Sequence, residues 1–285
     1  MTTLTFLARL GLWFALLGAA LTIPALAGEP TLTFQDGAEP VRQLTREEIS
    51  RLLPATEFAV ENPSTRQPAR YRGAILADLL TLVYGERWKS AGLVKFVTVD
   101  GYQPVVTAAA IQRHQGLMAY ADAGADRLRP LGDGHGGTVD PGPFYLVWDN
   151  LKDTGARTDP WLQWPWQLAK VELTSLEREY PQTAPPAGAS PEVLRGFNGF
   201  LSHCAKCHQI NGEGGQVGPE LNYPVNVTEY WQAEWLPKFI AKPADIRHNS
   251  KMPPYPASAG DAQAEIRDIL AYLRAMQERK LPPKQ

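Results

Sequence analysis

The sequence predicts two folded parts, an α+β domain with a mixed sheet followed by an all-α domain. Two observations support this fold class. Short runs rich in β-branched and aromatic residues alternate with helical patterns before residue 181, whereas the periodicity after residue 190 is helical. Between the two parts, residues 181–190 contain three prolines and no apolar periodicity, which predicts an extended Pro/Ala-rich linker.

Residues 1–27 have the features of a secretory signal peptide. Arg9 is the only charged residue there, an apolar run follows it, and the small residues Ala25 and Ala27 stand where a signal peptidase reads the chain. The alternative is an uncleaved membrane anchor, but a run of about 17 apolar residues that contains a proline is marginal for spanning a bilayer. We therefore expect an exported, periplasmic, soluble protein with no membrane span after cleavage.

Residues 28–180 are expected to form the α+β domain. Thr45 and Glu48 predict a capping box for a helix that runs through Leu53. Further helices are expected at residues 75–83 and 108–114, and strands at residues 93–99, 145–148 and 168–173. This irregular order favours a mixed sheet over a repeating βαβ array.

Residues 191–285 are expected to form the helical domain. Ser190 and Pro191 are a typical cap and first-turn residue of a helix. Along that helix Gly196 and Cys204 are two four-residue steps apart, so they share one face. A second helical pattern occupies residues 262–277, and the missing side chain at Gly196 would allow the two helices to approach closely.

The two cysteines of the chain both stand in the stretch CAKCH at residues 204–208. Two thiols at this spacing can form thioethers to the vinyl groups of haem c, and the adjacent His208 can ligate its iron. The alternatives are a redox dithiol and half of a zinc site. A helical pattern precedes the motif instead of a strand, and no second cysteine pair could complete a zinc site. Cys204 and Cys207 are therefore assigned to one covalent haem.

Two further motifs follow this stretch, GPEL at residues 218–221 and SKMPP at residues 250–254. With these motifs, residues 191–277 resemble a class I cytochrome c. The resemblance implies that the Pro219 carbonyl accepts a hydrogen bond from the axial His208, which orients the ring and increases its basicity. It also implies that Met252, held by the prolines after it, is the second axial ligand of the iron.

Other side chains could occupy the second axial position. Met118 is a further thioether, Met276 lies on an apolar helix face where core packing explains it better, and His203 adjoins a thioether cysteine. His248, four residues from Met252, is the strongest alternative. We favour Met252, because the SKMPP motif fits the methionine ligand loop of the family that residues 191–277 resemble, and His208 and a thioether then fill both axial positions. Such a haem has no site for a substrate, which predicts one-electron transfer instead of catalysis at iron.

Residues 56–173 resemble the molybdopterin-binding domain of sulfite-oxidase-type enzymes. The similarity lies in YRG at residues 71–73, VTVDGY at residues 97–102 and WPWQ at residues 164–167. Those enzymes bind molybdenum through a cysteine thiolate, whereas both cysteines here are assigned to haem, which argues against molybdopterin in this chain. The resemblance then implies a domain that docks a redox protein such as a dehydrogenase. The alternative is an oxidoreductase that oxidises a small substrate, such as a sulfur compound, in this domain.

The composition narrows the class of partners. With 44% hydrophobic and 20% charged residues the chain is globular, and a net charge of −2 argues against binding nucleic acid. The stretch 238–251 contains four basic residues, Lys238, Lys242, Arg247 and Lys251, and one acidic residue, Asp245. These basic side chains form either an ordinary solvated face or a rim that steers acidic redox partners to the haem. The sequence therefore favours an electron carrier between a protein donor and a protein acceptor, without catalysis of its own.

Overall fold

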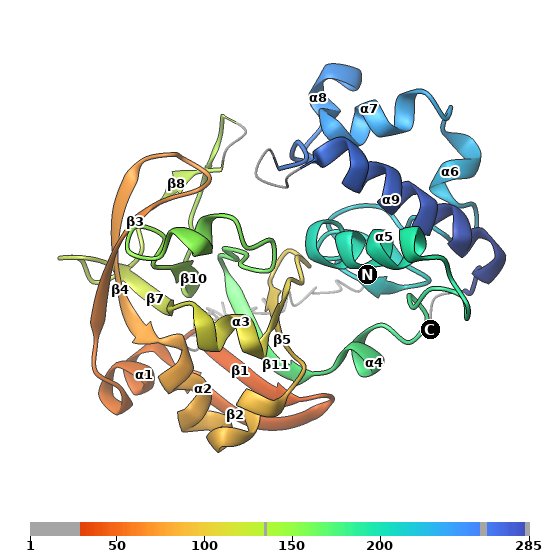
Figure 1. Cartoon of the computed structure of the whole chain (residues 1–285). Helices are drawn as coiled ribbons and strands as arrows, with labels where there is room; N and C mark the ends of the chain where they lie inside the picture. The colour runs from red at the N-terminus through yellow and green to blue at the C-terminus, as the bar shows by residue number, and fades with distance from the viewer. Residues whose placement is uncertain (1–28, 134–135, 257–260, 283–285) are drawn as a thin grey trace, which may run out of the picture.

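The computed structural model describes residues 29–133, 136–256 and 261–282, which form a β-rich domain and a helical domain (Figure 1). The predicted signal peptide at residues 1–27 lies outside the described residues. No helix in the described ranges has the length and apolar character to cross a membrane. The predicted fold class, an α+β domain with a mixed sheet followed by a helical domain, is confirmed.

The first domain is built mostly from strands, with short helices between them. The longer strands are β1 (Thr31–Asp36), β2 (Glu39–Thr45), β3 (Thr56–Glu61), β4 (Pro68–Ile75), β5 (Leu93–Thr98), β6 (Val105–Thr107), β7 (Gly116–Asp122), β10 (Tyr145–Trp148) and β11 (Leu168–Thr174). Two-residue strands β8 (Leu131–Gly132) and β9 (Thr138–Val139) pair with each other. The helices are α1 (Arg46–Leu52), α2 (Leu76–Tyr84), η1 (Gly85–Ser90), α3 (Ala108–Arg113), η2 (Thr154–Arg157) and α4 (Leu176–Glu179).

These strands form two main sheets. The first has the order β2-β1-β11-β5-β6, in which β1 pairs with β11 in parallel and the other pairs are antiparallel, so it is a mixed sheet as predicted. The second sheet, β10-β7-β4-β3, is antiparallel throughout. Fully buried side chains from both sheets, among them Phe34, Phe96, Met118 and Leu146, share one apolar core.

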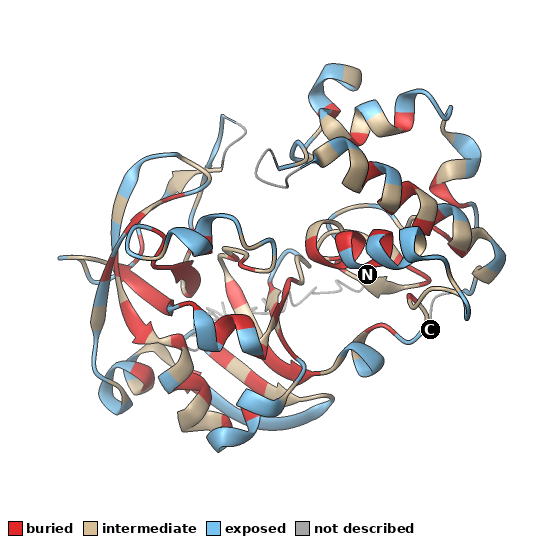
Figure 2. Ribbon diagram, viewed as in Figure 1, coloured by how far each residue is buried: buried red, intermediate tan, exposed pale blue. Residues whose placement is uncertain are grey.

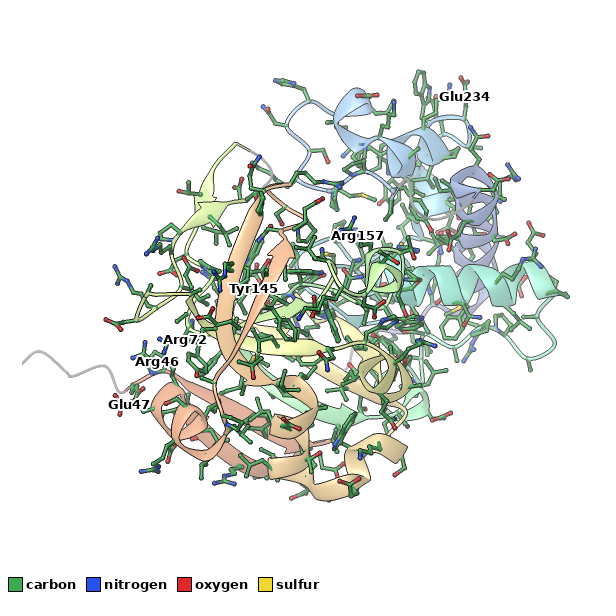
Figure 3. All side chains as sticks on the ribbon, turned by 60° about the vertical axis from the view of Figure 1, so that its left-hand side comes forward. Arg46, Glu47, Arg72, Tyr145, Arg157 and Glu234 are labelled. Atoms are coloured by element: carbon green, nitrogen blue, oxygen red, sulfur yellow. The ribbon has the colours of Figure 1, made fainter. Side chains whose placement is uncertain are left out.

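Strand β7 explains how the second sheet is covered on both faces. Met118 and Tyr120 point into the core shared with the first sheet, whereas Leu117 and Ala119 belong to a separate apolar cluster. Tyr145 of β10, which Figure 3 labels within the first domain, belongs to the same separate cluster as Leu117 and Ala119. An apolar run without alternation is what a strand buried on both faces requires.

The second domain is mainly helical. Its helices are α5 (Pro191–His203), α6 (Val227–Tyr230), α7 (Trp235–Ala241), α8 (Pro243–Ile246), α9 (Ala262–Ala275) and η3 (Met276–Arg279). A small hairpin of β12 (Gln209–Ile210) and β13 (Glu213–Gly214) follows α5. Figure 1 shows α5 crossing α9 at the centre of this domain.

Gly196 sets the distance between α5 and α9. A Cβ atom at this position would lie 1.9 Å from the carbonyl oxygen of Asp268 and 2.9 Å from Cβ of Tyr272. Only a glycine permits this approach, as the sequence predicted. The Arg195 guanidinium beside it donates two hydrogen bonds, of 2.6 and 3.2 Å, to the Asp268 carboxylate. The crossing fixes the end of α5, where the cysteine motif begins.

The predicted linker, residues 181–190, is bound to the second domain. The backbone N–H groups of Gln182 and Thr183 donate to Glu213 Oε2 at 2.8 and 2.9 Å. Thr183 is fully buried, and its carbonyl accepts a hydrogen bond of 2.6 Å from the Tyr272 hydroxyl. The start of this segment therefore has a defined path, while the domain boundaries assigned to it stay a prediction.

The two domains also share an apolar cluster. Leu93 of β5 and Val105 of β6 belong to the same buried cluster as Phe200, Ala205 and Ile210 of the second domain. Figure 2 shows in red the buried stretches of both domains. Because burying apolar surface is the main favourable term in association, the domains are held together by a continuous core and not by the chain connection alone.

Candidate functional site

The cysteine motif begins where α5 ends. Cys204 is the C-terminal cap of the helix, and its N–H donates to the Phe200 carbonyl at 2.8 Å. The chain then folds back in a turn, because the N–H groups of Cys207 and His208 both donate to the Cys204 carbonyl, at 3.0 and 2.9 Å. Neither cysteine is in a disulfide. The turn therefore presents two free thiols and one imidazole from five consecutive residues.

His208 is held by the loop that contains the GPEL motif. Its Nδ1 donates a hydrogen bond of 2.9 Å to the Pro219 carbonyl, so the lone pair of the neutral ring is on Nε2. Burial lowers the pKa of His208, and the Pro219 hydrogen bond opposes that shift in part. The neutral imidazole is the form that binds a metal ion, and a carbonyl on its other nitrogen is the usual way of orienting such a ligand.

Two glycines leave the room that this arrangement needs. A Cβ atom at Gly218 would lie 2.4 Å from Cε1 of His208, so any side chain there would displace the imidazole. A Cβ atom at Gly215 would lie 1.9 Å from the Lys206 carbonyl oxygen. The glycine of the GPEL motif is therefore explained by the position of the ring.

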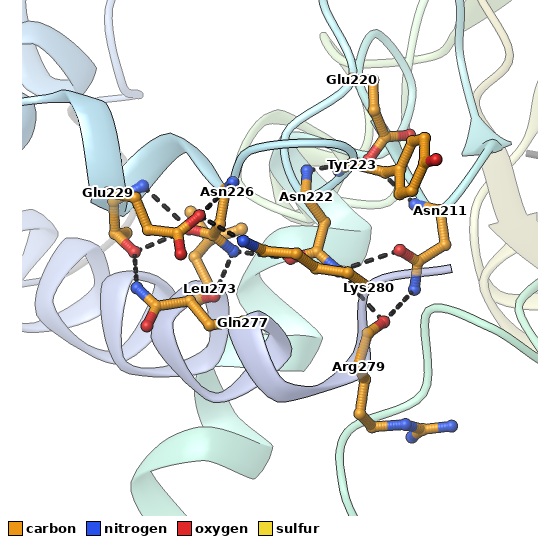
Figure 4. A network of polar contacts seen from close by, with 11 residues as sticks. Asn211, Glu220, Asn222, Tyr223, Asn226, Glu229, Leu273, Gln277, Arg279 and Lys280 are labelled. Atoms are coloured by element: carbon orange, nitrogen blue, oxygen red, sulfur yellow. Dashed lines mark hydrogen bonds and ion pairs between the residues drawn. The ribbon is translucent and has the colours of Figure 1, made fainter. Parts of the chain in front are cut away.

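Glu220 anchors the loop that carries the Pro219 carbonyl (Figure 4). Its two carboxylate oxygens accept four backbone N–H groups at distances of 2.8 to 3.1 Å, from Asn211, Gly212, Asn222 and Tyr223. Hydrogen bonds to a carboxylate are stronger than those between neutral groups. Glu220 thus ties the loop after Pro219 to the turn of the β12–β13 hairpin.

Three fully buried asparagines extend this network to the C-terminal helices. Asn226 Nδ2 donates to the Leu273 carbonyl at 2.8 Å, and Nδ2 of Asn211 and of Asn222 donate to the Arg279 carbonyl at 2.8 and 3.2 Å. The roles of these asparagines and of Glu220 were not predicted from the sequence. The sequence shows a charged residue directly after Pro219, but residue spacing alone does not predict which groups bind its carboxylate.

Met252 lies in the irregular segment after α8. It is half-buried and packs against the same apolar cluster as Cys204, so the structure brings the end of α5 and the SKMPP motif to one core. The N–H of Tyr255, three residues further on, donates to the Ala241 carbonyl at 3.2 Å, which fixes the segment against α7.

The competing ligand candidates have other surroundings. His248 is exposed, and Met118 and Met276 are fully buried in the cores of the first and second domains. The His203 ring packs on Tyr255 with a centroid distance of 4.9 Å, and its Nε2 is 3.6 Å from a Glu265 oxygen. Burial lowers the pKa of His203 to about 4.

The donor set fits haem c better than a zinc ion. Burial raises the pKa of Cys204 to about 12 and also raises that of Cys207, so both free thiols are protonated. Within the described ranges, no three His, Cys, Asp or Glu residues form a group that could hold a metal ion. Protonated thiols, a neutral imidazole and a nearby thioether are the groups that a covalent haem uses.

The motifs that resemble the molybdopterin-binding domain have structural roles here. A Cβ atom at Gly73 would lie 2.1 Å from the Met118 carbonyl oxygen, so the glycine of YRG is required by the pairing of β4 with β7. In VTVDGY, the Thr98 hydroxyl donates to Asp100, and Gly101 has a φ of 88°, which makes this stretch a turn after β5. The glycines of these two motifs are therefore explained by the backbone geometry of the first domain.

Comparison with known proteins identifies the second domain. Residues 193–277 match the family model of cytochrome c, so this part of the chain is a cytochrome c domain. No curated protein matches the chain. The cytochrome c domain implies a covalent haem c, haem-based electron transfer and redox proteins as partners. Nothing in the comparisons supports the resemblance of the first domain to sulfite-oxidase-type enzymes.

Proposed function

We propose that this chain is an exported monohaem c-type cytochrome that carries single electrons between a protein donor and a protein acceptor in the periplasm. In this proposal Cys204 and Cys207 would hold the haem through thioethers, and His208 and Met252 would ligate its iron. The haem, when bound, supplies the exchange between Fe(III) and Fe(II). The hydrogen bond of 2.9 Å between His208 and Pro219, directly beside two free thiols, is the observation that carries the proposal.

The protein's own contribution is to hold the ligands in place before the haem arrives. The Pro219 carbonyl fixes the tautomer of His208, Gly218 leaves room for its ring, and Glu220 holds the loop. A ligand oriented in this way needs little rearrangement when iron changes its oxidation state. This supports electron transfer, in which no bond to a substrate is made or broken.

The basic residues that precede Met252 in the chain support the proposal that the redox partner is acidic. Lys238, Lys242, Arg247 and Lys251 are all exposed. Lys238 pairs with Glu234 at 2.7 Å, at the outer end of the domain in Figure 3, whereas Lys242 and Lys251 form no ion pair with any described residue. Uncompensated charges on one face raise the rate of encounter with an oppositely charged protein, and salt screens that effect.

Ligand substitution tests the proposal. In the matured protein, Met252→Ala should remove the sulfur-to-iron charge-transfer band and lower the reduction potential, because a thioether ligand favours ferrous iron. Substituting both cysteines, Cys204→Ser with Cys207→Ser, should yield a chain that loses its haem in denaturant, because neither thioether can form. Met276→Leu, a change in the core, is the matched control and should keep the wild-type spectrum. A wild-type spectrum in Met252→Ala together with an altered one in His248→Ala would assign the axial position to His248.

A further inference from the structure

The first domain pairs with the cysteine turn through its main chain. The N–H of Gln103 donates to the Lys206 carbonyl at 2.9 Å, and the N–H of Gln216 donates to the Gly101 carbonyl at 2.9 Å. Gly101 has a φ of 88°, and a Cβ atom there would lie 3.2 Å from Cβ of Gln216. Residues 101–103 of the first domain therefore lie directly against the haem-attachment turn of the second.

Gln163 joins the same two segments through side chains. Its Oε1 accepts a hydrogen bond of 2.8 Å from Lys206 Nζ and one of 3.1 Å from the Tyr102 hydroxyl. Gln163 is itself fixed, because its carbonyl accepts from Nε1 of the fully buried Trp148 at 2.8 Å, and its Nε2 donates to the Pro160 carbonyl. Tyr102 and Lys206 thus share one rigid acceptor.

The hydrogen bonds to Gln163 place Tyr102 next to the turn that contains Lys206 and Cys207. Burial raises the pKa of Tyr102 well above its usual value, and the neighbouring Cys207 and Asp100 raise it further. The phenol therefore stays protonated and acts as the donor to Gln163. Ala205, next to Lys206 in the chain, belongs with Leu93 to the apolar cluster that the two domains share, so the contact is part of a packed interface.

We infer that the first domain is a structural part of the haem site: Tyr102, held by Gln163, covers the haem edge on the Cys207 side. The inference rests on the proposed function, because a thioether from Cys207 puts the porphyrin edge at that sulfur. Covering the edge excludes water and small redox reagents from it, and solvent exposure is one of the factors that set a haem potential. Partner proteins must then approach the haem from a surface of the second domain that the first domain does not cover.

The test compares substitutions at the interface in the full-length, matured protein. Tyr102→Ala should react with ferricyanide, which takes one electron from the ferrous protein, roughly tenfold faster than wild type, equivalent to about 1.4 kcal/mol in activation free energy. Its potential should fall, because water stabilises the more highly charged ferric state. Tyr102→Phe keeps the ring and should react at close to the wild-type rate. Gln112→Ala removes a glutamine that bonds only backbone carbonyls of the first domain, and it serves as the matched control.

The outcomes separate this inference from the proposed function. Absence of covalent haem in the wild-type protein overturns the proposed function. Covalent haem with wild-type rate and potential in Tyr102→Ala overturns the inference alone. If Tyr102→Ala does not mature, Gln163→Ala decides, because it removes the acceptor of both Tyr102 and Lys206. A faster reaction and a lower potential in that variant support the inference, and unchanged values overturn it.

Discussion

Glycines in the two domains have the same geometric role but different consequences. At Gly218 the absent side chain leaves room for the His208 ring, 2.4 Å from where a Cβ would lie, whereas at Gly73 it leaves room for a backbone carbonyl of the neighbouring strand, at 2.1 Å. The first glycine permits a ligand orientation, and the second permits a strand pairing. A glycine motif therefore indicates a functional site only when the group it makes room for has chemistry of its own.

Alanine at each of these glycines gives the largest expected contrast. Gly218→Ala should change the visible spectrum and the reduction potential of the haem, because the imidazole must move. Gly73→Ala should leave both unchanged and lower the free energy of unfolding of the first domain by about 3 kcal/mol, the cost of overpacking against backbone. Visible spectroscopy, potentiometry and denaturant titration measure these effects. An altered haem spectrum in Gly73→Ala together with a normal one in Gly218→Ala would contradict the roles assigned to the two glycines.

The two domains should also differ in how their free energy of unfolding depends on pH, because of His203 in the second domain. The pKa of His203 is about 4 in the folded protein, against about 6.5 in an unfolded chain. Between these values the unfolded chain binds a proton that the folded protein does not. The free energy of unfolding should therefore fall as pH decreases from about 6.5 to about 4, by at most about 3.4 kcal/mol, and His203 should contribute no pH dependence above that window.

Substitution isolates this contribution. His203→Gln should flatten the dependence between pH 4 and 6.5, as measured by denaturant titration of the second domain at a series of pH values. A profile with the wild-type slope in His203→Gln would show that other groups cause it. Because His203 lies on α5 and packs on Tyr255, the first domain should keep its own profile.

The smallest expected effect separates the half-buried carboxylate of Glu220 from an exposed ion pair. Glu220→Gln puts an amide NH₂ group among four N–H donors and should lower the free energy of unfolding by about 2 kcal/mol. The haem potential should also shift, since the Pro219 loop loosens. Glu234→Gln breaks only the exposed pair with Lys238 and should change neither quantity measurably. Equal effects of the two substitutions would contradict the role of Glu220 in holding the Pro219 loop.

The sequence predicted those elements whose causes are local. The strands at 93–99, 145–148 and 168–173 correspond to β5, β10 and β11, and the capping box of Thr45 and Glu48 is present at α1. Strand β2 was not predicted, because an edge strand with mostly exposed side chains has no apolar pattern. Strand β7 was not predicted either, because an apolar run buried on both faces resembles a buried helix segment.

In the candidate site, too, the residues in short local motifs were predicted, and those that depend on tertiary contacts were not. The CAKCH, GPEL and SKMPP motifs are visible because each is a short stretch with a fixed chemistry. Glu220, Tyr102 and Gln163 were not identified as parts of the site, since their partners are set by tertiary packing. Tyr102 and Gln163 are 61 residues apart and meet inside the first domain, and Gln163 accepts from Lys206 only because the two domains pack together. Long-range contacts of this kind leave no periodic signal in a single sequence.

The haem content of the purified chain, expressed with a c-type maturation system, tests the central claim most directly. A pyridine haemochrome assay should give one haem per chain with the spectrum of a thioether-linked porphyrin, and the colour should stay with the polypeptide in a denaturing gel. A matured chain that is colourless, or that releases its haem in denaturant, would contradict the assignment of Cys204, Cys207 and His208.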